Sequence, residues 1–480
     1  MSLLFRCFSI VLIFVFAFQP SYSKSKEQIK NEVNKLLKHK YLKNVNYSIK
    51  VLSKDNEEIL FNVGEKKALT PASTTKLLTT SCALDKLTKN FQIKTIICSD
   101  TEISNNIIQG DLYLKGYGNP LLTSSDLEHI ATILTLRGLR VIEGDIIIDD
   151  SYFDSKLFRN QWIDSKEQSF AEPAISAVTV DQNTLYVHLT STGKINSNPE
   201  VVVYPELSDL KIVNNAKTAN VSRKNETASM SLKEVDGKYT LTITGKIGKN
   251  RTKYLDVKIK NPTLFCGALL KSTLSSRGIF VNGIIKTGKL PENHIMLAQH
   301  ILPIDSLISI INKNSNNFCA DQLLKIIGAE TGKKDGSAKN GISTIYSYLK
   351  GNNIDTTNLK IYDGSGLSRQ NKLNSNTLLQ LLYNITNNEK IFETFYNSLS
   401  CAGIDGSLKH RMRDVIESAD VRGKTGTLSD VTSVVGYVTS ADNELLIFTI
   451  LMDNVKFGVL DLRNMQDQIV TLFSEFSRDY

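Results

Sequence analysis

The chain has 480 residues, of which 41% are hydrophobic and 22% are charged, and its formal net charge is +8 at pH 7. This composition is typical of a globular protein with two or three domains and argues against an intrinsically disordered chain. The positive charges are spread along the sequence without a nucleic-acid-binding motif, so nucleic acid is not an expected partner.

The N-terminal segment differs from the rest of the chain. Arg6 precedes an apolar run over residues 10–18, and the small residues Ser21 and Ser23 follow it. This pattern predicts a secretory signal peptide over residues 1–23, cleaved after Ser23, and therefore a periplasmic or otherwise extracytoplasmic protein. An uncleaved anchor is the alternative, although the run is shorter than the ~20 apolar residues of a membrane-spanning helix. No later segment reaches that length, so we expect no stable membrane span after cleavage.

The cysteines and histidines argue against a disulfide framework and a metal site. Cys7 lies in the signal segment, and the other cysteines are irregularly spaced. This spacing predicts buried free thiols, with a single disulfide bridge as the alternative. These other cysteines are Cys82, Cys98, Cys266, Cys319 and Cys401. The histidines show no metal-ligand spacing with cysteine or acidic residues, so we expect no metal and no other cofactor.

The first predicted elements are a helix, a hairpin and a second helix. Ile29 and Val33 lie on one helical stripe, and alternating apolar residues predict strands over 45–51 and 59–61. The second helix is predicted to begin at Pro71, because proline is tolerated in the first turn of a helix.

Residues 95–265 predict an inserted β-rich region. Short strands, such as 110–115, alternate with turns there, and a helix over 127–136 interrupts them. Helices then return, and the chain ends in two strands and an amphipathic helix. We therefore predict an α/β (α+β) fold: an antiparallel sheet flanked by helices, formed by a discontinuous domain of residues 24–94 and 266–480 that carries the insertion.

An S-x-x-K motif lies at Ser73-Thr74-Thr75-Lys76. Three residues are just under one helical turn, so the hydroxyl and the amine lie on one face, where a desolvated lysine can activate the serine. A helix-capping serine is the alternative interpretation of Ser73. Among the serines that begin an S-x-x-K pattern, only Ser73 opens an apolar-faced helix. The other serines that begin this pattern are Ser21, Ser23, Ser191, Ser208 and Ser347.

An S-x-N motif, Ser315-Asn316-Asn317, stands just before a predicted helix. There Ser315 can relay a proton while Asn317 orients a substrate amide. A second copy at 104–106 precedes a strand in the insertion, and we interpret it as a turn.

A K-T-G motif, Lys424-Thr425-Gly426-Thr427, lies on a predicted strand. Its lysine and hydroxyls can hold a substrate carboxylate, and its glycine leaves room for close approach. A second K-T-G at 286–288 precedes the S-x-N motif, which breaks the expected order, so we interpret it as a strand end and turn.

The three motifs, in this order, resemble the signatures of penicillin-recognising serine enzymes. The stretches 110–116, 363–369 and 402–408, with the long gap before Ser315, resemble the class C low-molecular-mass penicillin-binding proteins, the D-alanyl-D-alanine carboxypeptidase/endopeptidases. The resemblance runs from about residue 70 to 455.

Two positions depart from the family pattern. Asn119 stands where aspartate is frequent and Ser407 where threonine is usual, and we expect neither to touch the three motifs. Residues 363–368 are expected to form a turn that braces the site.

The resemblance implies a role for each motif residue. Ser73 is the acylated nucleophile, Lys76 its base, Ser315 a proton relay and Asn317 a substrate-positioning residue. Lys424, Thr425 and Thr427 bind the terminal carboxylate, Gly426 admits the substrate, and the backbone N–H groups of Ser73 and Thr427 form an oxyanion hole.

Asp150 and Phe153 are candidates for a pocket that receives the diamino-acid side chain, with a strand end and a core aromatic as the alternative. The implied partners are peptidoglycan peptides, with β-lactam antibiotics as covalent inhibitors. A β-lactamase of the same ancestry and a non-catalytic cell-wall-binding protein are the alternative functions.

Overall fold

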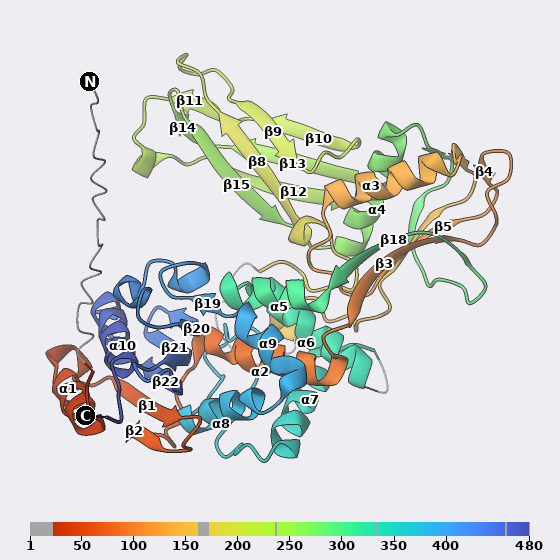
Figure 1. Cartoon of the computed structure of the whole chain (residues 1–480). Helices are drawn as coiled ribbons and strands as arrows, with labels where there is room; N and C mark the ends of the chain where they lie inside the picture. Colours follow the sequence, from red (N-terminus) through yellow and green to blue (C-terminus); the bar gives the residue numbers. More distant parts are fainter. Residues whose placement is uncertain (1–22, 162–171, 236–237, 333–334, 457, 480) are drawn as a thin grey trace, which may run out of the picture.

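The computed structural model describes residues 23–161, 172–235, 238–332, 335–456 and 458–479 (Figure 1). The predicted signal peptide, apart from Ser23, lies outside these ranges and stays a prediction. Across the described ranges, no helix combines the length and the apolar character needed to traverse a lipid bilayer.

A six-stranded antiparallel sheet forms the base of the fold, in the order β19-β20-β21-β22-β1-β2. Val51 lies opposite Phe448, so the first and last parts of the chain pair in one sheet, as predicted. The strands are β1 (Asn46–Ser53), β2 (Ile59–Val63), β19 (Ser400–Cys401), β20 (Val421–Leu428), β21 (Val431–Thr439) and β22 (Leu445–Asp453).

Helices cover both faces of this sheet (Figure 1). The helices α1 (Lys26–Leu36) and α10 (Val459–Ser474) pack on one face, and α8 (Ser375–Thr386) packs on the other. Central strand β21 is buried on both sides because its side chains alternate: Val434 joins the core under α10, whereas Val435 joins the core of the helical cluster. The predicted antiparallel sheet flanked by helices is confirmed.

The helical cluster surrounds α2 (Lys76–Leu87), which is buried over most of its length. Leu77 and Leu78 are fully buried, so α2 lies inside the protein rather than on its surface. The other helices of the cluster are α5 (Ile304–Lys313), α6 (Asn317–Thr331), α7 (Ala338–Gly351) and α9 (Glu389–Ser398).

A five-stranded mixed sheet, in the order β17-β7-β5-β3-β18, leads away from the helical cluster (Figure 1). Its strands are β3 (Gln92–Ser99), β5 (Leu112–Gly116), β7 (Ile146–Asp149), β17 (Ile285–Thr287) and β18 (Ile295–Pro303). The helices α3 (Ser124–Leu136) and α4 (Pro262–Ser276) pack on it, and β4 (Ile107–Ile108), β6 (Val141–Ile142) and β16 (Phe280–Val281) form a small parallel sheet beside it.

This pairing bears on the predicted domain limits. The expected end of the insertion at residue 265 would divide the five-stranded sheet, because β17 and β18 follow it in the chain. Strand pairing therefore favours an insertion that ends after β18. The division into domains otherwise stays a prediction.

The outermost part of the insertion consists of short sheets around a small apolar core of its own (Figure 1). Its strands are β8 (Thr184–Thr190), β9 (Glu200–Tyr204), β10 (Leu210–Asn214), β11 (Lys217–Ala219), β12 (Ser229–Val235), β13 (Lys238–Thr244), β14 (Lys246–Gly248) and β15 (Thr252–Lys258).

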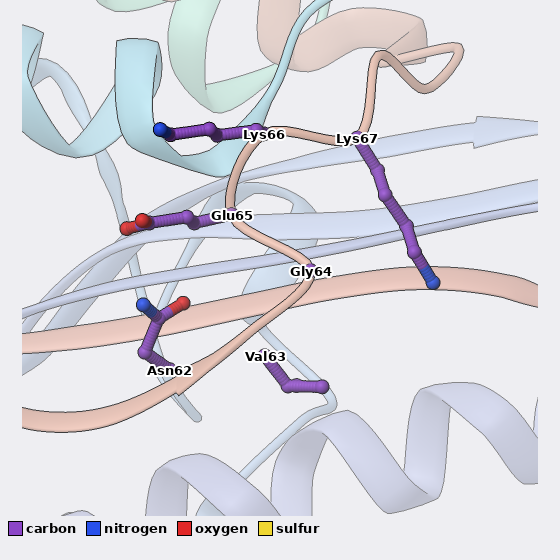
Figure 2. Close-up of a pocket in the computed structure, with 6 residues that line it drawn as sticks. All are labelled: Asn62, Val63, Gly64, Glu65, Lys66 and Lys67. Carbon is purple, nitrogen blue, oxygen red and sulfur yellow. The ribbon is translucent and has the colours of Figure 1, made fainter.

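The edge strand β2 runs into a turn beside a shallow hollow of about 460 Å³, lined by residues 62–67 (Figure 2). Gly64 has a φ of +68°, and a Cβ at this position would lie 2.8 Å from the Tyr47 carbonyl oxygen, so the turn requires glycine. None of the motif residues lines this hollow.

Candidate active site

Ser73 lies in a 3₁₀ turn, Ala72–Thr75, that leads directly into α2. The prediction that Ser73 opens the helix is confirmed, with the difference that this first turn is 3₁₀ rather than α. Two hydroxyls tighten the turn: Thr74 Oγ1 donates to the Pro71 carbonyl at 2.9 Å, and Thr75 Oγ1 donates to the Ala72 carbonyl at 3.0 Å. Ser73 itself is half-buried, so its hydroxyl stays accessible.

The Lys76 amine faces Ser73. Its Nζ lies 2.9 Å from Ser73 Oγ, 2.7 Å from Asn317 Oδ1 and 2.5 Å from the Ser365 carbonyl oxygen. Burial lowers the pKa of Lys76 to about 8, although the charges of Asp321 and Asp363 act in the opposite direction. A lysine with this pKa is neutral often enough near physiological pH to accept a proton from a serine.

The S-x-N motif forms the start of α6. Asn316 caps the helix, its side chain accepting the Cys319 N–H at 2.9 Å, and Asn317 is the first helical residue. Ser315 has a φ of +56°, a left-handed conformation that is uncommon for serine and that occurs more often at functional sites. The motif thus places the Ser315 hydroxyl before the capping residue and the Asn317 amide after it.

The K-T-G motif lies on β20, as the prediction of a strand at this motif required. Lys424 is fully buried, and its Nζ lies 2.9 Å from Ser315 Oγ and 2.9 Å from the Thr425 carbonyl oxygen. Burial, with a smaller effect from the charge of Lys76, lowers the pKa of Lys424. The first and third motifs are therefore close enough to influence each other electrostatically.

Gly426 allows β20 to lie against the serine turn. A Cβ at this position would lie 2.6 Å from the Pro71 carbonyl oxygen and 3.1 Å from the Ser73 nitrogen. On the neighbouring strand, Ser433 Oγ donates to the same Pro71 carbonyl at 2.8 Å. The backbone of β20 next to Gly426 thus lies beside the Ser73 N–H group.

Two threonines continue the motif, and each has a partner that the sequence did not identify. Thr425 Oγ1 bonds to Ser407 Oγ at 2.8 Å, and Arg463 of α10 donates to Thr427 Oγ1 at 2.8 Å. The expectation that Ser407 does not touch the motifs is wrong, because the 406–408 turn packs beside β20. Asn119 does stay apart from them; its amide bonds to His300 Nδ1.

Buried acids beneath Lys76 also escaped sequence reasoning. Asp321 of α6 and Asp363 are 2% and 0% exposed. The available signal was the position of Asp321 between apolar residues of the predicted helix, such as Phe318 and Leu323. The predicted bracing turn at 363–368 is present, and its Ser365 carbonyl contacts Lys76 directly.

The second copies of two motifs lie in the insertion, away from this network. Lys286 is exposed and pairs with Asp145. Asn105 and Asn106 have positive φ angles in the turn before β4, so the interpretation of the second S-x-N as a turn is confirmed.

The two pocket candidates are not brought into contact with the motif residues. Asp150 accepts a hydrogen bond from Thr263 of α4 at 2.5 Å. Phe153 is 5% exposed, lies in the core of the helical cluster and stacks on Tyr152. These contacts favour the structural alternative, and a pocket role for either residue stays a prediction.

Cysteine, histidine and acidic side chains do not gather into a possible metal site anywhere in the described ranges. The cysteines of these ranges carry free thiols; Cys401 is half-buried and the other four are buried, in line with the prediction. The candidate site is therefore built from serine, lysine, asparagine and backbone groups.

Comparisons with known proteins point to one family. Residues 29–476 match the model of the D-Ala-D-Ala carboxypeptidase 3 (S13) family. A D-alanyl-D-alanine carboxypeptidase of Actinomadura sp. is 28% identical over 470 residues, covering 94% of this chain and 85% of that protein. The D-alanyl-D-alanine carboxypeptidase DacB of Haemophilus influenzae is 26% identical over 427 residues, covering 87% of each.

Solved structures show the same fold. The crystal structure of penicillin binding protein 4 (dacB) from Haemophilus influenzae aligns with a TM-score of 0.79 at 23% sequence identity, covering 92% of this chain and 99% of that one. The expected resemblance is thus confirmed in sequence and in fold. The chain belongs to the D-Ala-D-Ala carboxypeptidase 3 (S13) family and is a serine-type D-Ala-D-Ala carboxypeptidase of the class C low-molecular-mass penicillin-binding proteins.

Proposed function

We propose that this enzyme hydrolyses the terminal D-Ala–D-Ala bond of peptidoglycan stem peptides through an acyl-enzyme on Ser73. The observation that carries the proposal is the 2.9 Å contact between Ser73 Oγ and a buried Lys76 amine with a pKa of about 8. A hydroxyl and a partly neutral amine at this distance form an activated nucleophile.

In the first step, neutral Lys76 takes the proton of Ser73 while Oγ attacks the carbonyl carbon of the penultimate D-alanine. The carbonyl oxygen becomes an oxyanion, which the backbone N–H groups of Ser73 and Thr427 stabilise. The approach of β20 to the Ser73 nitrogen at Gly426 supports this pairing of donors. Asn317, which shares the Lys76 amine with Ser73, orients the substrate amide.

In the second step the C–N bond breaks, and the departing amine of D-alanine receives, through Ser315, the proton that Lys76 took from Ser73. Lys424, whose Nζ contacts Ser315 Oγ, orients this hydroxyl for the transfer. Lys76 is then neutral again; it takes a proton from the water that attacks the ester and passes that proton to the Ser73 oxygen as the shortened peptide leaves. The cycle consumes one water and releases one D-alanine.

Lys424, Thr425 and Thr427 bind the terminal carboxylate, because they present a cation and two hydroxyls along one strand. The same site cleaves D-alanyl crosslinks between stem peptides, in which a peptide amine replaces free D-alanine. Penicillins acylate Ser73 because their strained amide resembles the bond that is cut. A crystal structure of the Haemophilus protein in complex with a β-lactam fits this expectation.

Peptidoglycan lies outside the cytoplasm, so this substrate requires an extracytoplasmic enzyme. The predicted signal peptide supplies the export route.

A fluorescent penicillin tests the proposal directly. The mature protein is incubated with the reagent, the labelled peptide is identified by mass spectrometry, and D-alanine release from a stem pentapeptide is measured. We expect a stable label on Ser73 and loss of both label and release in Ser73→Ala.

The matched control is Ser347→Ala, which alters an exposed S-x-x-K serine of α7 whose hydroxyl donates to the Ser343 carbonyl one turn earlier in the same helix. This variant should keep full labelling and release. A label on any residue but Ser73 contradicts the proposal, rapid penicillin turnover indicates a β-lactamase, and unchanged wall binding without D-alanine release indicates a non-catalytic protein.

A further inference from the structure

The two buried acids beneath Lys76 share one cation from a distant part of the chain. Arg159 lies in a 3₁₀ turn, Arg159–Gln161, on the segment that connects β7 and β8. Its side chain is only 14% exposed. Buried carboxylates require a compensating partner, because the protein interior solvates an isolated charge poorly.

The guanidinium of Arg159 spans both acids. Its Nη1 lies 3.1 Å from Ser365 Oγ and 3.4 Å from Asp321 Oδ2, and its Nη2 bonds to Asp363. This forked geometry suits arginine, whose planar group can hold two partners at fixed positions. One side chain therefore joins α6 to the 363–368 turn.

Asp363 in turn shapes the backbone of that turn. Its Oδ1 accepts the Gly366 N–H at 2.7 Å, and its Oδ2 accepts the Ser368 N–H at 2.8 Å. Gly366 packs directly against the serine turn, since a Cβ there would lie 1.9 Å from the Ala72 carbonyl oxygen. The position of the turn is thus fixed relative to the nucleophile.

Asp321 holds the same turn from the other side. Its Oδ1 accepts the Gly364 N–H at 2.8 Å. Between these anchors, the Ser365 carbonyl oxygen lies 2.5 Å from Lys76 Nζ, while the Ser365 hydroxyl bonds to Arg159. Arg159 thus contacts the residue whose carbonyl positions Lys76.

A second buried ion pair fixes the segment that carries Arg159. Lys325 of α6 is buried, and its Nζ lies 2.7 Å from Asp154 Oδ1 and 2.5 Å from the Lys156 carbonyl oxygen. Two ion pairs therefore connect the segment of residues 154–159 to α6. In one the cation is Lys325 of α6, and in the other it is Arg159 of the segment.

We propose that Arg159 is a positioning residue for Lys76, holding the Ser365 carbonyl in place and balancing the two buried carboxylates next to the lysine. The proposal rests on the proposed function, in which Lys76 is the base for Ser73. It adds a residue of the inserted region to the machinery of the peptidase domain.

Charged groups on three neighbouring segments act on Lys76. They are Asp321 on α6, Asp363 in the turn, and Arg159 and Glu172 on the segment between β7 and β8. The charge of Lys76 in turn lowers the pKa of Lys424 on β20 and opposes the rise that burial causes in the pKa of Cys319 on α6. Arg159 lowers the pKa of Lys76, whereas Asp321 and Asp363 raise it. Without Arg159 the two acids raise the pKa of Lys76 further, so the lysine keeps its proton to a higher pH and a smaller fraction of it is in the neutral, proton-accepting form at pH 7.

The test is the pH profile of Ser73 acylation by a fluorescent penicillin between about pH 6 and 10, chosen to bracket the lysine titration. Arg159→Met should move the midpoint upward by about one pH unit, which lowers the rate near pH 7 about tenfold and leaves the high-pH plateau near that of the wild type. Arg159→Lys, which keeps the charge, should shift the midpoint less.

The double variant Arg159→Met/Asp321→Asn is the rescue. It removes one charge of each sign, and asparagine keeps the acceptor for the Gly364 N–H, so the midpoint should return toward the wild-type value. Thermal unfolding and the final extent of labelling establish that each variant is folded.

An equal loss of rate at every pH, or a midpoint that does not move, overturns the inference. If Arg159→Met does not fold, the double variant and Arg159→Lys test the inference instead. The inference requires both variants to be acylated with pH midpoints near that of the wild type. These outcomes leave the proposed function intact as long as the label stays on Ser73; a label elsewhere in the wild type overturns that function instead.

Discussion

Lys424 and Lys286 begin the same three-residue sequence, yet the first is buried within β20 and the second is exposed on the edge strand β17. Lys424 Nζ contacts Ser315 Oγ, and burial lowers the pKa of this lysine. Lys286 pairs with Asp145, and this partner raises its pKa. The pKa values of the lysines in two identical motifs are therefore shifted in opposite directions.

The glycines of the two triplets also differ in how closely they pack on neighbouring backbone. A Cβ on Gly426 would collide with the Pro71 carbonyl oxygen at 2.6 Å, whereas a Cβ on Gly288 would meet only a methyl group of Ile147 at 2.7 Å. Backbone cannot yield as a flexible side chain can. Only the triplet on β20 lies against the turn that carries Ser73, and the proposed chemical role belongs to that copy.

The largest expected effect separates the two lysines. Lys424→Met should lower kcat/KM for D-alanine release by about 100- to 1,000-fold, because it removes the buried amine that contacts Ser315 Oγ and that we propose binds the substrate carboxylate. Lys286→Met, the matched control, should change kcat/KM less than about twofold, since exposed ion pairs contribute little. Steady-state kinetics on a stem pentapeptide measures both.

Equal losses in the two variants would break the comparison. A small loss in Lys424→Met alone would assign the carboxylate to another cation, such as Arg463 beside Thr427.

The pH dependence of the wild type sharpens the contrast between buried and exposed lysines. The pKa of Lys76 is lowered to about 8, and its active form in the proposed mechanism is neutral, so we expect activity to be lost as pH falls. Acylation by penicillin should fall about tenfold per pH unit below this midpoint, to about 1% of the plateau near pH 6. Stopped-flow fluorescence gives the profile.

Lys286→Met should leave that midpoint unchanged. A flat profile between pH 6 and 9 would exclude Lys76 as the proton acceptor.

Sequence order alone separated the two K-T-G copies, because a motif that precedes S-x-N cannot follow the family arrangement. Strand β20 and the start of α6 were also predictable, since alternation and capping residues are local signals. The helix that begins at Lys76 differed from the prediction only in that a 3₁₀ turn, Ala72–Thr75, precedes it.

What could not be predicted depends on contacts between distant segments. Arg159 is 204 residues from Asp363, and no local pattern marks it as a partner of a buried acid. Ser407 was judged remote for the same reason: its contact with Thr425 arises from packing of the 406–408 turn on β20. Local periodicity in the sequence predicts helices and strands, whereas a network of buried charges can be recognised only once the fold has brought distant segments together.

Ser407 gives the smallest effect and tests the threonine of the triplet. Thr425 Oγ1 bonds to Ser407 Oγ, whereas the corresponding Thr287 is exposed. Ser407→Ala removes the neutral hydrogen bonds of this hydroxyl to Thr425 Oγ1 and Ser400 Oγ. We expect kcat/KM for the pentapeptide to fall about 2- to 10-fold, mainly through KM, because the Thr425 hydroxyl is then less well oriented toward the carboxylate. Ser407→Thr keeps the hydroxyl and supplies the residue usual in the family, so it should stay within about twofold of the wild type. If both variants lose activity equally, the space around residue 407 matters rather than its hydroxyl, and Thr425 is oriented by the backbone of β20 alone.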